Sequence, residues 1–277
     1  MAPQHQPVPT GGSQYDRAFF LRIQGAEEWK RSHGQVLPPR IQSPVRWAKI
    51  RAGMSVLDVG TGRGELPLFC AAQGAEATGI DYSEDALELA KEAAALSQVR
   101  DHCHFRAMDC LLLEFEDQSF DRVFMLDVIE HLRPDEVRRA LGEIRRVLRP
   151  DGQLLIHTEP NLAFVKLMLP IYESRALNWA LRPLMVAVTG SPIAFGPDRA
   201  QVHVNEQSPQ TLRGALAEAG FSGRVWSSGL YGWGELKQPR QLLKRVVLTG
   251  WPLTMVPPLR QVFGVNVWAQ VSPAGKP

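Results

Sequence analysis

Short apolar segments alternate with amphipathic segments between residues 54 and 160, and this alternation constrains the fold more than any other feature. The predicted strands are "MSVLDVG" (54–60), "AEATGIDY" (75–82), "HCHFRAMD" (102–109), "FDRVFMLD" (120–127) and "QLLIHTEP" (153–160). The segments 65–74, 84–97 and 135–149 between them are predicted helices. Strands that alternate with helices form a mostly parallel sheet with helices on both faces. The chain is therefore predicted to be an α/β protein with a Rossmann-like, doubly wound sheet.

The pattern is interrupted after residue 160 and then resumes with a predicted helix (209–220) and two further strands (221–229 and 265–272). The predicted organisation begins with a disordered Pro/Gln/Gly-rich tail (1–14) and an N-terminal helical cap (15–50) that contains a loop at 37–44. A cofactor-binding core (51–160) and a helical lid insertion (161–205) follow. The C-terminal part of the core (206–277) contains a second insertion (230–263). The two insertions are apolar but broken by charges or prolines, and they are expected to cover the site and select the substrate.

A glycine-rich loop follows the first predicted strand in "VLDVGTGRG" (56–64). A phosphate-binding P-loop needs a Lys after its last glycine, but Glu65 stands there. The spacing of Gly60, Gly62 and Gly64 also differs from the dinucleotide fingerprint GxGxxG. However, Asp81 ends the second predicted strand about 20 residues further on, where an acid that binds ribose is expected. The loop therefore indicates a nucleoside ligand, with an NAD(P)-dependent enzyme as one alternative.

A nucleoside that has a positive charge and no phosphate agrees best with this loop. Glycines allow the backbone to approach the ligand closely. Asp58 adds negative potential near a cation, or only holds the loop in place. Asp81 can accept hydrogen bonds from both ribose hydroxyls, and Asp109, at the end of the third strand, can accept one from the adenine amine. These features predict S-adenosylmethionine (SAM).

Several segments resemble the class I SAM-dependent methyltransferases in order and spacing: "VLDVGTGRG", "GIDYS", "MDC", "FDRVFMLDVIEHL" and "LRPDGQLLIHTEPN". The resemblance covers about residues 54–160, and "SPQTLRGALAEAGF" is similar to a later helix of that family. It implies a seven-stranded sheet whose last strand is antiparallel. It also implies a set of cofactor-binding residues, which are Asp58, Gly60, Thr61, Gly62, Gly64, Asp81, Tyr82, Asp109, Cys110, Leu126 and Asp127.

The segment "DVIEHL" (127–132) follows the fourth strand and contributes Asp127, Glu130 and His131, while His203 precedes the later helix. This pattern resembles the metal-dependent ubiquinone-type O-methyltransferases and the small-RNA 3′-end 2′-O-methyltransferases. Both groups favour ExxEH, so Asp127 is a departure with a shorter side chain. The resemblance implies a divalent metal held by Asp127, Glu130, His131 and His203. The alternatives are that His131 or His203 is a metal-free general base, or that both are structural.

The predicted function is methyl transfer from SAM to a small-molecule acceptor, at oxygen, with a natural-product, quinone-like or sugar-derived substrate. The alternatives are a non-catalytic SAM-binding module or partner subunit, and the 3′-terminal ribose of small RNA as acceptor. The apolar insertions also suggest a peripheral membrane contact, a homodimer interface or an extra layer of core.

The remaining composition restricts the partners and the compartment. A formal net charge of +2 gives no indication of nucleic-acid binding. Cys70, Cys103 and Cys110 form no CxxC pair, which favours a reducing, cytoplasmic location. Continuous apolar runs are shorter than the roughly 18 residues that indicate a membrane span.

Overall fold

The computed structural model describes residues 15–23, 25–167, 174, 203–228, 259 and 264–275. The predicted disordered tail (1–14) lies outside these residues. Most of the predicted insertions, 161–205 and 230–263, also lies outside them, and so do the membrane or dimer contacts expected there. Within the described part of the chain, no helix is long and apolar enough to cross a membrane.

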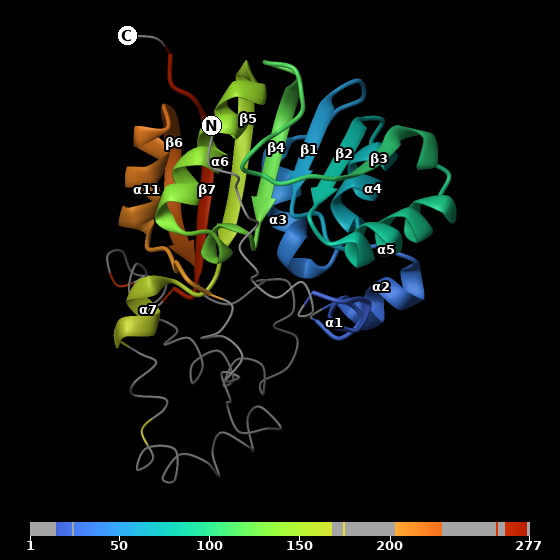
Figure 1. Ribbon diagram of the computed structural model, residues 1–277, viewed down its shortest axis with the longest axis horizontal. Helices are drawn as coiled ribbons and strands as arrows, with labels where there is room; N and C mark the ends of the chain where they lie inside the picture. The colour runs from blue at the N-terminus through green and yellow to red at the C-terminus, as the bar shows by residue number, and fades with distance from the viewer. Residues whose placement is uncertain are drawn as a thin grey trace, which may run out of the picture.

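Seven strands form one sheet in the order β3-β2-β1-β4-β5-β7-β6 (Figure 1). The strands are β1 (Ser55–Val59), β2 (Glu76–Asp81), β3 (Cys103–Ala107), β4 (Phe120–Leu126), β5 (Leu148–Thr158), β6 (Phe221–Ser228) and β7 (Asn266–Pro273). β1 to β5 pair in parallel, whereas β7 is antiparallel to both β5 and β6. The predicted fold class, with its antiparallel last strand, is confirmed.

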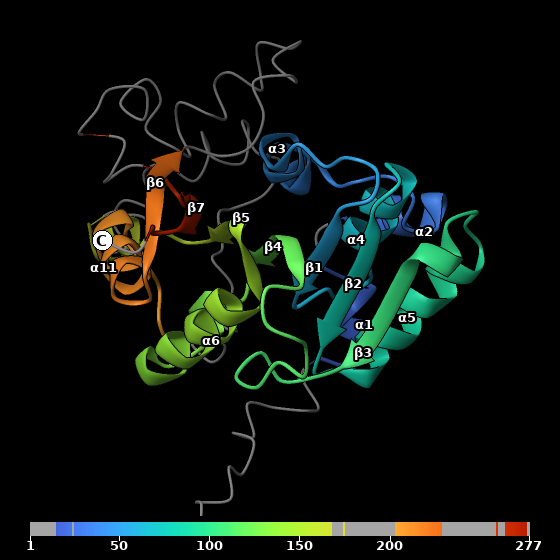
Figure 2. The same cartoon turned by 90° about the horizontal axis from the view of Figure 1, so that it is seen from above.

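Helices cover both faces of the sheet, as Figure 2 shows from above. The helices α4 (Glu65–Ala72) and α5 (Glu84–Ala95) share one apolar core with the N-terminal helices, and α6 (Pro134–Val147) and α11 (Pro209–Glu218) share the other. A parallel strand covered on both faces is a nearly continuous apolar run. β1 is such a strand, because every residue from Val56 to Val59 is buried. Asp58 is therefore an ionisable group inside the core, at the end of a central strand.

The N-terminal cap contains α1 (Arg17–Phe20), α2 (Ala26–Ser32) and α3 (Pro39–Ala48). The loop predicted at 37–44 is wrong, because α3 begins at Pro39 and continues through Pro44. Proline is well suited to the first turn of a helix, whereas Pro44 removes one internal hydrogen bond. Burial of Ile41, Val45 and Ala48 on one side of α3 offsets this loss.

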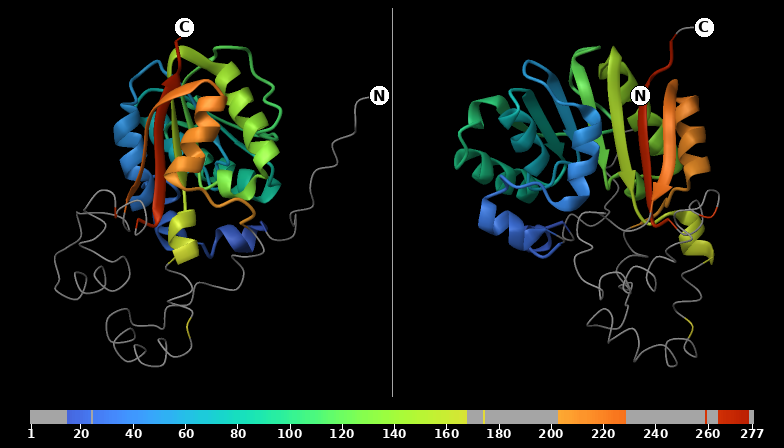
Figure 3. Two further views of the ribbon diagram at one scale, coloured as in Figure 1. Left: turned by 90° about the vertical axis from the view of Figure 1, so that its left-hand side faces the viewer. Right: turned by 180° about the vertical axis from the view of Figure 1, so that it is seen from behind.

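The parallel strands all end at one edge of the sheet, and other parts of the chain gather beyond that edge. α1, α2 and α7 (Leu162–Leu167) lie there in both views of Figure 3. Two short 3-10 helices, η1 (Arg100–His102) and η2 (Ile129–His131), complete the described elements. η2 follows β4 directly and so lies at the same edge, which is where open α/β sheets bind ligands.

Candidate functional site

A cavity of about 510 Å³ lies at the carboxyl ends of β1, β2 and β4. The N-terminal cap, the glycine loop and the segments that follow β2, β3 and β4 supply its lining. Ten of the eleven predicted cofactor-binding residues line it: Asp58, Gly60, Thr61, Gly62, Asp81, Tyr82, Asp109, Cys110, Leu126 and Asp127. Six acidic residues and three arginines contribute to the lining, and this balance suits a ligand with positive charge.

The glycine loop closes tightly because its glycines have positive φ angles. Gly60 has a φ of +73°, and a Cβ there would lie 2.4 Å from Cγ2 of Val128. Only glycine allows β1 to pass this closely to the segment after β4. The amides of Gly60 and Thr61 both donate to the carbonyl of Ile80, at 2.9 Å, so the loop is also tied to the end of β2.

Gly64 is the predicted cofactor residue that does not line the cavity. Its φ is +80°, and a Cβ there would lie 2.7 Å from Ala90 and 3.0 Å from the ring of Phe105. Gly64 precedes α4 as its N-cap. Gly64 therefore packs closely between the loop, α5 and β3, and its contact with the cofactor stays a prediction.

Asp81 holds the loop in the shape that the cavity requires. One carboxylate oxygen accepts a hydrogen bond from the amide of Gly62, and the other accepts one from the amide of Ser83, both at 2.9 Å. Burial raises the pKa of Asp81, while these amide hydrogen bonds oppose that rise. A carboxylate has about four acceptor positions, so Asp81 keeps acceptor capacity for a ligand hydroxyl.

Asp58 is 4% exposed and accepts a hydrogen bond of 2.8 Å from the hydroxyl of Thr61. Burial raises the pKa of Asp58 to about 7, and the hydrogen bond from Thr61 opposes the rise. The side chain thus both ties down the glycine loop and lines the cavity. A nearby cation would favour its ionised form.

The segment after β3 forms the far end of the cavity. Asp109 is exposed, and one of its oxygens accepts a hydrogen bond of 2.9 Å from the amide of Leu111. Cys110 is half-buried beside it, and burial raises the pKa of its thiol to about 12, so the thiol is neutral at physiological pH. Tyr82, directly after Asp81, is an exposed ring on the cavity wall.

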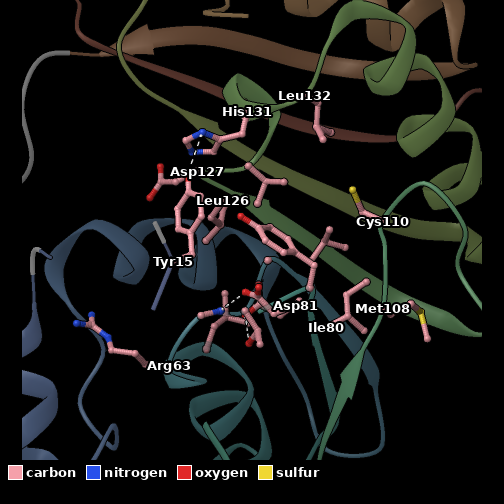
Figure 4. A pocket seen from close by; sticks show the side chains of 18 of the residues that line it. Tyr15, Arg63, Ile80, Asp81, Met108, Cys110, Leu126, Asp127, His131 and Leu132 are labelled. Carbon is pink, nitrogen blue, oxygen red and sulfur yellow. Dashed lines mark hydrogen bonds between the residues drawn. The ribbon is translucent and has the colours of Figure 1, made fainter. Parts of the chain in front are cut away.

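Tyr15 is a cavity residue that the sequence analysis missed. Its hydroxyl lies 3.5 Å from Nδ1 of His131, and its ring meets Tyr82 edge-on at a centroid distance of 5.8 Å. Figure 4 shows the ring extending toward His131. Burial, with the charges of Glu130 and Asp81, raises the pKa of Tyr15 to about 12. No motif marks this position, because Tyr15 lies just before α1, in an N-terminal segment that packs over the cavity only in the folded chain.

Three of the four predicted metal ligands meet beside Tyr15. One ligand atom from each of Glu130, His131 and His203 lies within 4.8 Å of the others. The ring centroids of His131 and His203 are 5.0 Å apart. The carbonyl of Glu130 accepts hydrogen bonds from the amides of Val204 (3.0 Å) and Asn205 (3.1 Å), which hold the His203 segment against η2. Burial raises the pKa of the Glu130 carboxyl to about 7.

Asp127, the fourth predicted metal ligand, lies outside this group of three residues. It has a φ of +58°, and its carboxylate forms an ion pair with Arg40 and a hydrogen bond with Nδ1 of His157. His157 is 2% exposed, and its Nε2 lies 2.8 Å from Oδ1 of Asn266. The carboxylate of Asp127 is therefore turned toward these groups rather than toward His203.

Comparison with known proteins agrees with this geometry. Residues 57–156 match the family described as a methyltransferase domain. A demethylmenaquinone methyltransferase from Symbiobacterium thermophilum is 31% identical over 169 residues, which cover 56% of this chain and 63% of that protein. A ubiquinone biosynthesis O-methyltransferase from Coxiella burnetii is 31% identical over 138 residues, covering 48% of this chain and 57% of that protein. The chain spans less than two thirds of the length of these curated relatives.

The solved structure of a SAM-dependent methyltransferase from Methanosarcina mazei has a similar fold. It is 19% identical, with a TM-score of 0.56 over 87% of this chain and 99% of that one. The sheet order and the glycine loop are those of class I SAM-dependent methyltransferases, whose cofactor is SAM, and residues 57–156 match the methyltransferase domain family named above.

Proposed function

We propose that this protein transfers the methyl group of SAM to an oxygen atom of a small-molecule acceptor. The observation that carries this proposal is that the glycine loop, Asp81 and His131 line the same cavity. Glu130 and His203 are grouped directly beside His131. A cofactor-binding half and a proton-accepting half therefore adjoin each other at the edge of the sheet. O-methylation requires both, because a hydroxyl is a poor nucleophile until its proton is removed.

The cavity residues suit SAM in one orientation, with adenine at β3 and the methionine part at β1. Asp109 and Cys110 lie after β3 and are proposed to contact adenine, while Asp81 at the end of β2 accepts hydrogen bonds from the ribose hydroxyls. Gly60 and Gly62, after β1, face the methionine part, and Leu126 lies beside the sulfonium. SAM supplies an electrophilic methyl carbon and departs as S-adenosylhomocysteine. Holding the acceptor oxygen close to and in line with that carbon supplies several kcal/mol of catalysis, roughly 7–11 at the upper end.

His131 is the proposed proton acceptor. His203, which lies beside it, is the alternative proton acceptor. The imidazole of His131 lines the cavity, and imidazole is the side chain that most often serves as a general base. The acceptor hydroxyl gives its proton to the imidazole as its oxygen forms the bond to the methyl carbon and the carbon–sulfur bond breaks. Tyr15, at 3.5 Å from Nδ1, orients the ring.

The same residues fit a divalent metal ion, and this is the alternative mechanism. Two imidazoles and one carboxylate from Glu130, His131 and His203 form a donor set used for Fe²⁺, Zn²⁺ or Mn²⁺. A metal bound there would lower the pKa of a coordinated hydroxyl. The buried carboxyl of Glu130 supports this alternative, because a cation would favour the ionised form that burial disfavours.

The proposed acceptor is quinone-like, natural-product or sugar-derived. The matched relatives are named for demethylmenaquinone and for ubiquinone biosynthesis. Phe19, Phe20 and Ile23 add apolar surface to the cavity, which suits an apolar ring system better than a strongly charged acceptor. We also propose a cytoplasmic location, since Cys70, Cys103 and Cys110 are all free thiols.

Calorimetric titration with SAM and with S-adenosylhomocysteine tests the proposal. Both ligands are expected to bind. NAD is expected not to bind, so nicotinamide fluorescence should show no quenching with the protein. A panel of quinols and phenols should yield products 14 mass units heavier by mass spectrometry. A lack of binding by either SAM ligand would refute the proposal. Binding with no turnover on any acceptor would instead favour a non-catalytic SAM-binding module.

The two mechanisms are separated by metal removal. A metal site predicts that EDTA abolishes activity, that Mn²⁺ or Fe²⁺ restores it, and that Glu130→Gln and His203→Ala lower the metal content of the purified protein. A metal-free base predicts that activity survives EDTA and is lost in His131→Ala. His104→Ala, which alters an exposed histidine on β3, is the matched control and should change neither readout.

A further inference from the structure

One residue of the cavity wall comes from a part of the chain far from the others in sequence. Among the described residues that line the cavity, every one except Val204 lies between Tyr15 and Glu136. Val204 belongs to the segment that follows His203 and precedes α11. The proposed cofactor contacts all lie on the earlier segments, so Val204 borders the part of the cavity that is left for the acceptor.

The side chain of Val204 is apolar and uncovered. Of the large apolar side chains that are exposed in the described part of the chain, only Tyr82 (59%) and Val204 (50%) line the cavity. Tyr82 follows Asp81 at the proposed ribose position, whereas Val204 adjoins the group of Glu130, His131 and His203. An apolar side chain that is exposed in a cavity is stabilised when a ligand removes water from it. Val204 therefore favours an acceptor with apolar surface at this point.

The backbone of Val204 is fixed relative to His131. The amides of Val204 and Asn205 both donate to the carbonyl of Glu130, at 3.0 Å and 3.1 Å. Glu130 directly precedes His131 in η2, and the ring of His203 lies 5.0 Å from the ring of His131. The wall at Val204 is therefore anchored to the same short helix as the proposed proton acceptor. A fixed contact beside the reacting groups helps to align the acceptor oxygen with the methyl carbon.

Tyr15 borders His131 from a second part of the chain. Its hydroxyl lies 3.5 Å from Nδ1 of His131, and the ring centroids of the two residues are 6.1 Å apart. Figure 4 shows the two rings close together at the cavity. An aromatic ring and a fixed apolar side chain near one imidazole suit a planar, apolar acceptor whose hydroxyl is directed at that imidazole.

We propose that Val204 determines acceptor specificity by contacting an apolar substituent on the ring carbon next to the reacting hydroxyl. The hydroxyl has to face His131, and Val204 is bonded to the residue that precedes His131, so its contact falls on atoms beside the hydroxyl. The acceptor class is therefore a phenol or quinol that carries a small apolar group in the ortho position. This inference rests on the proposed function, because it assumes that an acceptor oxygen is methylated beside His131.

A series of phenols that differ only in the ortho substituent tests the proposal. The substituent is hydrogen, methyl or isopropyl, and kcat/KM is measured for each phenol by mass spectrometry of the methylated product. Wild-type protein should prefer the methyl compound over the unsubstituted one about 5- to 10-fold, toward the lower end of what one methyl group supplies in an enclosed pocket. Val204→Thr, which replaces a methyl group by a hydroxyl, should reduce this ratio to within about twofold.

Val204→Ala adds a readout that partial unfolding cannot imitate. Removal of two methyl groups leaves space at the wall, so this variant should shift the preference from methyl to isopropyl. The Kd of S-adenosylhomocysteine should stay within about twofold in both Val204 variants, since Val204 is not among the proposed cofactor contacts. Val36→Thr and Val36→Ala are the matched controls, because Val36 is 46% exposed and lies outside the described cavity lining, and they should leave all ratios unchanged.

An unchanged methyl-to-hydrogen ratio in Val204→Thr, or a Val204→Ala variant that still prefers methyl, would overturn the proposal. Wild-type protein that binds S-adenosylhomocysteine but methylates no phenol of the series would overturn it as well. Wild-type protein that binds neither SAM nor S-adenosylhomocysteine would refute the proposed function itself, so the failures are distinguishable.

Discussion

Asp58→Asn is expected to stabilise the ligand-free protein at neutral and alkaline pH. Asp58 is 4% exposed, and burial raises the pKa of its carboxyl to about 7. Above that pH the folded protein holds a negative charge in the core, beneath the glycine loop. Asparagine keeps an oxygen that accepts the hydrogen bond of 2.8 Å from the Thr61 hydroxyl. The substitution therefore removes the ionisation and retains most of the local packing.

The direction and size of the effect follow from proton linkage. Because the pKa of Asp58 is higher in the folded protein than in the unfolded chain, the folded state binds the proton more tightly. The stability contribution of Asp58 therefore falls as pH rises from about 4 to about 7 and stays low above that range. A pKa raised from 3.8 to about 7 corresponds to about 4 kcal/mol at high pH. Structural relaxation makes this value an upper limit.

Urea denaturation at several pH values between about 5.5 and 8.5 measures this effect. The advantage of Asp58→Asn over wild type should grow by about 2 kcal/mol between pH 5.5 and 8. Asp101→Asn, whose side chain is 86% exposed, is the control, and its effect should stay within about 0.5 kcal/mol at every pH. An advantage that does not change with pH, or a net loss of stability at pH 8, would refute the argument.

Three further predictions concern packing and positioning. Gly60→Ala should lower stability by about 2–4 kcal/mol, because its Cβ would approach a valine to 2.4 Å at a φ of +73°. Gly53→Ala has a similar φ of +78° with open space around it, so it should lose only about 1 kcal/mol, and equal losses in thermal unfolding would contradict the packing argument. Arg63→Met should cost about 3–5 kcal/mol in chemical denaturation, because it leaves a buried glutamate without its cation, and a loss below about 1 kcal/mol would show that the pair is not needed. Tyr15→Phe should reduce kcat about fivefold through the lost contact with His131 while the Kd of S-adenosylhomocysteine stays within about twofold, whereas an unchanged kcat would exclude this orienting role.

Much of the cofactor half of the site could be predicted because its residues are adjacent in sequence to strand ends. The glycine loop follows β1, and Asp81 ends β2. A parallel sheet brings the carboxyl ends of its strands to one edge, so these segments meet once the strand pattern is recognised. For Gly64 the loop spacing is less informative, because it does not distinguish a glycine that faces a ligand from one that packs against Ala90.

The N-terminal contribution could not be predicted in the same way. Tyr15, just before α1, and Arg40, in α3, reach the cavity from the segment that precedes the sheet, and no local motif links them to it. The two prolines of α3 indicated a loop, yet packing of the apolar side of this helix against the sheet outweighs its weak intrinsic preference. Such contacts depend on how the helices dock, and docking is a property of the whole core.

The sequence alone determined the alternation of strands and helices, the class of domain and the nature of the cofactor, because period, glycine spacing and strand-end acids are local properties. Only the tertiary structure decided which charged side chains lie in contact with one another. It paired Asp127 with Arg40 and His157, and it left Glu130 with His131 and His203 as a separate group. Charges attract or repel according to distance and burial, and neither quantity exists until the chain has folded.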